Sequence, residues 1–133
     1  MESQTSTPSQ RAVETAAVAP PGFDYPPLLL TLLRGSLPAI QPWAWLVERP
    51  GQLTSVATRL AASFPDRRLV PFAKNPATDD AYGFDGFDLS GDPAVHVIRM
   101  SAPAGSEYRG QWAGFAEWLD EADDVHGEWL LRS

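Results

Sequence analysis

Apolar positions that alternate or cluster predict four β-strands in this chain. Gln41–Glu48 is rich in aromatic residues, and Ala94–Met100 alternates between two faces. Leu69–Ala73 is a short apolar run, and a polar loop separates it from the aromatic segment Asp80–Asp85. This pattern is typical of two strands joined by a turn, and Pro71 predicts an edge position or a bulge in the first of them.

Apolar residues at helical spacing predict three helices, over Phe23–Arg34, Gln52–Ser63 and Gln111–Asp124. The stripe on the third helix consists of Trp112, Phe115, Ala116, Leu119 and Ala122. Residues 1–22 lack such a stripe and are rich in Ser, Thr, Pro, Gln and Ala, so we predict a disordered N-terminal tail. Within this tail the sequence leaves open a weak helix over Arg11–Val18, ended by Pro20 and Pro21.

These elements predict one α+β domain over residues 23–133. The chain has 133 residues, a length typical of a single domain, and 44% of them are hydrophobic. No strand–helix–strand repeat with a Gly-rich turn occurs, so a doubly wound sheet is not expected. We therefore expect a mixed, mostly antiparallel sheet of about four to six strands with helices packed against it.

The sequence contains no cysteine, which excludes disulfides, cysteine metal ligands and a thiol nucleophile. The N-terminal residues lack the basic start and apolar core of a signal peptide. The longest apolar run, Pro26–Leu33, is far shorter than the roughly 20 residues that a membrane span needs. We therefore expect a cytoplasmic protein without a membrane partner.

Charge is distributed unevenly along the chain, whose formal net charge is −7. Residues 1–78 carry 7 basic and 5 acidic side chains, whereas residues 79–133 carry 3 basic and 12 acidic ones. A nucleic-acid site would need the opposite sign, so nucleic acid is not an expected partner. An acidic half can attract a basic protein, although acids can also serve only solubility.

Candidate catalytic and metal-binding residues do not form a recognisable motif. His96 and His126 lie 30 residues apart, outside any zinc-ligand spacing. The acids near Asp80 lack the EF-hand spacing, because Tyr82 stands where that motif needs an oxygen ligand. Lys74 is the single lysine, and no Gly-rich phosphate loop or nucleophile elbow accompanies it. We expect no cofactor, metal or catalytic residue.

Acidic side chains and one tryptophan are the candidate partner-binding residues. They are Asp79, Asp80, Asp85, Asp88, Glu117, Trp118, Asp120, Glu121, Asp123 and Asp124. Five of these acids lie toward the C-terminal end of the third predicted helix, where they oppose its dipole, and this hints at a role in binding. Trp118 lies beside the apolar stripe, and tryptophan is enriched at interface hot spots.

Three segments together resemble the SMI1/KNR4 (SUKH) family over Phe23–Ala122. They are the PFA and DDAYGFD motifs within Leu69–Asp85, the strand Val95–Ile98, and the FAEWL segment at Phe115–Leu119. The resemblance implies an α+β fold, no catalysis and no cofactor. It also implies a bacterial immunity protein that blocks a toxin by direct binding.

These observations lead to one main hypothesis and two alternatives. The main hypothesis is an immunity protein whose acidic surface binds a basic toxin domain, such as a nuclease. One alternative is a scaffold or regulatory module of the same fold without a toxin partner. The other is a small metal-dependent hydrolase.

Overall fold

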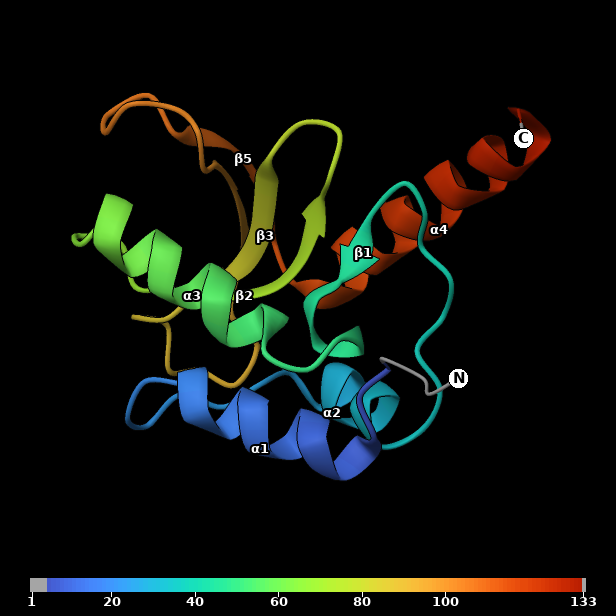
Figure 1. The fold of residues 1–133 in the computed structure, drawn as a ribbon, viewed down its shortest axis with the longest axis horizontal. Coiled ribbons are helices and arrows are strands. Elements are labelled where there is room, and N and C mark those ends of the chain that lie inside the picture. Colours follow the sequence, from blue (N-terminus) through green and yellow to red (C-terminus); the bar gives the residue numbers. More distant parts are fainter. Residues whose placement is uncertain (1–4, 133) are drawn as a thin grey trace.

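The computed structural model describes residues 5–132, which form a five-stranded sheet and four α-helices (Figure 1). The strands are β1 (Ala44–Trp45), β2 (Leu69–Asn75), β3 (Asp80–Asp85), β4 (Val95–Arg99) and β5 (Tyr108–Trp112). The helices are α1 (Pro8–Val18), α2 (Pro27–Arg34), α3 (Gln52–Ser63) and α4 (Phe115–Arg132), and a 3₁₀ turn covers Leu46–Glu48. The α+β prediction is confirmed.

The sheet is an antiparallel meander. Its strand order is β1-β2-β3-β4-β5, and each strand pairs antiparallel with its neighbours in the sequence. The register of β2 against β3 shifts between Pro71 and Ala73, as the proline predicted, because its nitrogen cannot donate to the ladder. The shortest strand, β1, covers only Ala44–Trp45 of the predicted strand Gln41–Glu48.

Helices cover both faces of the sheet and one end of it (Figure 1). The ring of Phe84 on β3 lies 6.0 Å from the ring of Phe115 on α4, so this face packs against α4. Leu69 on β2 lines a groove beside Ala57 of α3 on the opposite face. Helices α1 and α2 lie together across the end of the sheet (Figure 1).

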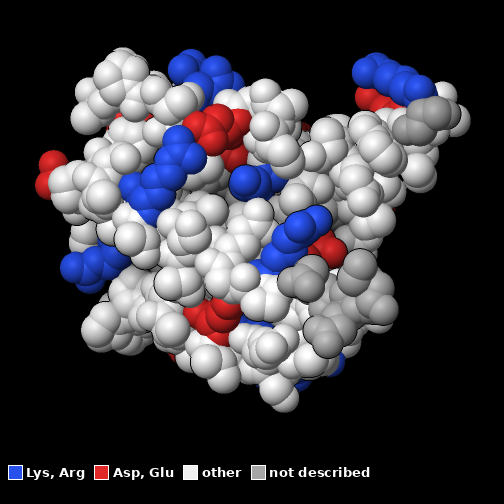
Figure 2. All heavy atoms as spheres, viewed as in Figure 1, with Lys and Arg blue, Asp and Glu red and all other residues white. Residues whose placement is uncertain are grey.

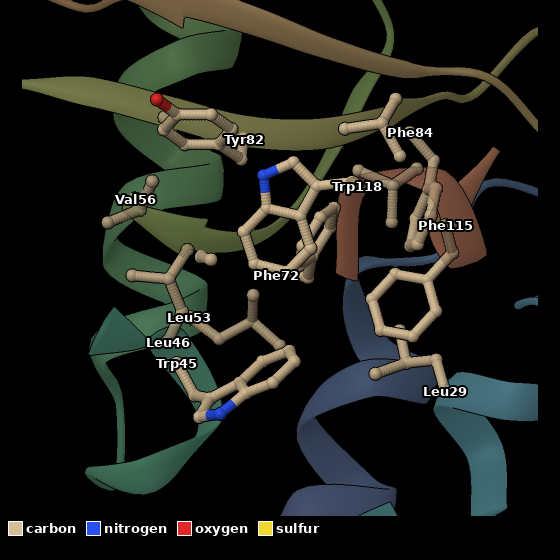
Figure 3. Close-up of a cluster of buried hydrophobic side chains, with 14 of the residues drawn as sticks. Leu29, Trp45, Leu46, Leu53, Val56, Phe72, Tyr82, Phe84, Phe115 and Trp118 are labelled. Carbon is tan, nitrogen blue, oxygen red and sulfur yellow. The ribbon is translucent and has the colours of Figure 1, made fainter. Parts of the chain in front are cut away.

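Aromatic side chains fill the core on the α4 side, with Trp118 among them (Figure 3). The Trp118 ring lies 4.8 Å from that of Phe72, 5.9 Å from those of Trp45 and Tyr82, and 6.0 Å from that of Phe115. Such edge and offset contacts contribute beyond the burial of apolar area. This cluster joins β1, β2 and β3 to α4.

The prediction of a disordered tail over residues 1–22 is wrong for Pro8–Val18, which forms α1. Thr7 and Gln10 make a capping box at its start. The helix is held by polar contacts, including a hydrogen bond that the Tyr25 hydroxyl donates to the Thr15 carbonyl at 2.8 Å. Because α1 lacks a clear apolar stripe, the hydrophobic pattern of the sequence does not predict this helix. Residues 1–4 lie outside the described part of the chain.

The third predicted helix, Gln111–Asp124, is displaced in the structure. Gln111 and Trp112 belong to β5, and α4 begins at Phe115 and continues to Arg132. It passes through Gly127, which lowers helix propensity but does not end this helix. The predicted unfavourable dipole position of the acids is therefore wrong, because they lie in the first turn and the middle of α4.

Candidate functional site: the acidic face of α4

One side of α4 carries six carboxylates, and we call this surface the acidic face of α4. Its residues are Glu117, Asp120, Glu121, Asp123, Asp124 and Glu128, and all six are exposed. The helix contains one basic residue, Arg132, in its last turn. Among residues 5–132, no Lys or Arg forms an ion pair with any of these six carboxylates.

The acids on this face are close neighbours of one another. Asp120 stands three residues before Asp123 and four before Asp124, and Glu117 stands four before Glu121. Like charges at these spacings destabilise a helix by about 0.2–0.5 kcal/mol per pair. The acidic face therefore opposes the stability of the helix that carries it, which favours a role outside folding.

The acidic face adjoins the edge strand β5. The Trp112 indole donates a hydrogen bond from Nε1 to Oε1 of Glu121 at 3.2 Å, and its ring lies 5.8 Å from that of Tyr82. Burial raises the pKa of the Tyr82 hydroxyl, and the charges of Asp80 and Glu121 act in the same direction. The hydrogen bond between Trp112 and Glu121 therefore joins the acidic face of α4 to the edge strand β5.

Two predicted partner-binding acids, Asp79 and Asp80, are already paired within the chain. Asp79 forms an ion pair with Arg59 of α3 at 2.9 Å, and Asp80 forms one with Arg99 of β4 at 2.8 Å. The hydrogen bond from Arg99 to Asp80 raises the pKa of the guanidinium. Asp80 is also largely buried, so neither acid belongs to a free acidic surface.

Asp85 ends β3 and Asp88 lies in the loop that follows, and both side chains accept hydrogen bonds from the backbone of that loop. Asp85 Oδ1 accepts a hydrogen bond from the Phe87 N–H at 2.9 Å, and Asp88 Oδ1 accepts one from the Ser90 N–H at 3.0 Å. Hydrogen bonds from Ser90 lower the pKa of Asp88. Asp80 and Asp85 stand five steps apart on a strand, roughly 16 Å, so the predicted acids do not form one site.

The prediction that Trp118 anchors a partner at the surface is wrong, because its side chain is completely buried. The exposed large apolar side chains of α4 are instead Trp129, Leu130 and Leu131 near its C-terminal end. Figures 1 and 2 show this end of the helix standing out from the body of the molecule. The four-residue spacing from Val125 to Trp129 continues the helical stripe and indicates that the helix extends to Trp129.

The two histidines lie on different elements with aromatic neighbours. His96 on β4 meets the ring of Tyr108 edge-on at 5.8 Å, and His126 on α4 stacks on Trp129 at 5.8 Å. Within residues 5–132, no group of three or more His, Asp or Glu side chains is placed to share a metal ion. No helix in the same range has the length and hydropathy of a membrane span.

Comparison with known proteins adds one distant similarity. No family model matches the chain, and no solved structure matches it. Part of the chain is similar to lipoprotein LpqB of Corynebacterium jeikeium (strain K411), with 32% identity over an alignment of 100 residues. That alignment covers 62% of this chain and 17% of the lipoprotein, so the chain spans about a sixth of this curated relative's length.

Proposed function

We propose that this protein is a non-catalytic binding protein that holds a basic protein partner on the acidic face of α4. One observation carries the proposal: six exposed carboxylates on a single helix, without a basic partner among the described residues. Their mutual repulsion costs stability, and a positively charged partner would relieve it. The acids in the β2–β3 turn are excluded from this surface because arginines neutralise them.

We favour a bacterial toxin domain as the partner, which makes the protein an immunity protein of the SMI1/KNR4 (SUKH) type. The support is the resemblance of the PFA, DDAYGFD and FAEWL segments, together with an α+β fold of the class that the resemblance implies. The mechanism is occlusion: α4 covers a basic surface that the toxin needs. Electrostatic attraction mainly accelerates association and sets specificity.

The test is co-expression with a toxin domain encoded next to the gene, combined with binding kinetics on the purified pair. We expect the native protein to protect the cells. Charge reversal at Asp120, Asp123 and Asp124 to lysine should slow association by about tenfold or more and remove most of its salt dependence. Asp24→Lys, a reversal of an exposed acid outside α4, is the control and should leave association nearly unchanged.

The outcomes separate the immunity role from its alternatives. Equal cell death with and without the protein, and no complex, would remove the immunity role. A complex that forms without protection would favour a scaffold or regulatory module of the same fold. A complex that the three reversals on α4 leave intact would show that another surface binds the partner.

A further inference from the structure

A second surface, distinct from the acidic face of α4, is a groove between the C-terminal end of α1, α3 and the start of β2. Its volume is about 460 Å³, and we call it the α1–α3 groove. Arg67, Arg68, Leu69 and Phe87 line it and also line a neighbouring hollow of about 210 Å³. These four residues form the boundary between the two spaces.

The charge of the α1–α3 groove is opposite to that of the chain. Arg67 and Arg68 are its charged lining residues among those described, in a protein of formal net charge −7. The smaller hollow differs, because Asp66, Asp85 and His96 also line it. Burial lowers the pKa of His96, so this ring adds little positive charge near pH 7, and the two carboxylates offset the two arginines that also line the hollow. An anion is therefore favoured in the α1–α3 groove over the hollow.

Both arginines are held in place before any ligand arrives. Arg67 donates from Nε to Oε2 of the buried Glu107 at 2.6 Å, and its guanidinium lies 5.5 Å from the centre of the Tyr108 ring. The guanidinium of Arg68 lies 4.8 Å from the centre of the Phe87 ring. Glu107 balances the charge of Arg67 and leaves its terminal nitrogens as donors, so Arg68 supplies the uncompensated positive charge.

The remaining walls of the groove are mainly apolar. Val18 of α1, Ala57 and Ala61 of α3 and Leu69 of β2 line it, together with Phe87. Phe87 is 60% exposed, although phenylalanine is usually buried in proteins. Its ring is therefore accessible to a ligand in the groove. Two arginines among mainly apolar side chains, with Thr54 and Thr58 as the other polar lining residues, suit a ligand with a charged group and an apolar body.

We propose that the α1–α3 groove binds a small amphipathic organic anion. Its carboxylate or phosphate group is held by Arg68 and the terminal nitrogens of Arg67. Its aliphatic or aromatic body lies along α1 and α3 and against Phe87. This site is independent of the acidic face of α4 and of the partner proposed there.

The test is an NMR titration of the full chain with octanoate, octyl phosphate and octylamine. We expect saturable shifts of the amides around Arg68 and Phe87 with the two anions and none with the amine. Arg68→Ala should weaken anion binding by roughly tenfold to a hundredfold, since it removes a charged hydrogen-bond donor. Arg67 is unsuitable for substitution because its ion pair with Glu107 supports the fold.

Two further variants locate the bound anion. Ala61→Trp places a bulky side chain at an exposed α3 position in the groove and should weaken binding without changing the charge. Arg109→Ala removes an exposed arginine outside the groove and should leave binding unchanged. The proposal is overturned if no saturable binding occurs, if the amine binds equally, or if Arg68→Ala or Ala61→Trp has no effect.

Discussion

Trp118 shows how a single residue can matter for folding rather than for binding. Its ring contacts aromatic side chains from β1, β2 and β3, so it links α4 to most of the sheet. We expect Trp118→Ala to lower the free energy of unfolding by about 3–5 kcal/mol, measured by chemical denaturation. Trp118→Phe should cost only roughly 1–2 kcal/mol, since it keeps a ring and removes a buried indole N–H that has no acceptor among the described residues.

Trp129 is the matched control for this prediction, because it lies on the same helix but is 39% exposed. Trp129→Ala should lower the free energy of unfolding by less than about 1 kcal/mol. Equal effects of the alanine substitutions at the two positions would contradict the assignment of Trp118 to the core.

At the same scale, the sequence identifies the acidic residues but does not show which of them form ion pairs with arginines. Arg59 and Asp79 are 20 residues apart, and Arg99 and Asp80 are 19 apart. Their pairing depends on how α3 and β4 are placed beside the β2–β3 turn. The candidate site is consequently reduced from two regions of the sequence to α4, whose acids form no ion pair with an arginine or lysine within residues 5–132.

At the scale of elements, α4 contains a position that limits its own stability. Gly127 lies inside the helix, its φ is not positive, and a Cβ there would meet no atom within 4 Å outside the helix. Glycine in a helix interior costs roughly 0.5–1 kcal/mol relative to alanine. We therefore expect Gly127→Ala to raise the free energy of unfolding by up to about 1 kcal/mol, measured by thermal or chemical denaturation.

Gly105 is the control for the glycine prediction, since its φ of +100° is one that alanine rarely adopts. Gly105→Ala should destabilise the protein. If Gly127→Ala were also destabilising, α4 would not extend through this position in solution.

Helices and strands with a clear hydrophobic pattern could be predicted from the sequence. Those that are stabilised mainly by contacts with neighbouring elements could not. The bounds of α3 and β3 agree with the sequence prediction, because α3 has an apolar stripe and β3 is an aromatic run between turns. Strand β5 has mostly exposed residues and a glycine at its centre, so it shows no alternation. It forms because the edge of β4 offers backbone groups with which β5 can pair. Helix α1 was indicated only as a weak alternative over Arg11–Val18, since many of its docking contacts are polar.

At the scale of the whole molecule, the ion pair between Arg67 and Glu107 joins residues 40 positions apart. The hydrogen bond from Arg67 lowers the pKa of Glu107 below its ordinary value of 4.5. A carboxylate whose folded-state pKa is lowered stabilises the fold above its unfolded-state pKa, and that contribution is lost as the pH falls through the folded-state value. The native protein should therefore lose stability below about pH 4.5.

Glu107→Gln isolates this contribution. Its free energy of unfolding should be lower than that of the native protein by about 1–3 kcal/mol at pH 7. The difference should narrow steadily as the pH falls below 4.5, because the native carboxylate becomes protonated. Denaturant titrations of both proteins over a pH series measure this difference in free energy of unfolding. A difference that stays constant down to strong acid would contradict a stabilising role for the Glu107 carboxylate.

The meander topology has a consequence for how the chain folds. Strands β2, β3, β4 and β5 are joined by short loops, so this part of the sheet can grow hairpin by hairpin without first closing a long loop. Strand β1 is the exception, because residues 46–68, which include α3, separate it from β2. Such local pairing lowers the contact order, and proteins with low contact order fold quickly for their size. The β2–β3 hairpin, closed by a short turn at residues 76–79, is the natural place for that growth to begin. Residues 69–85 would then be the first part of the sheet to form.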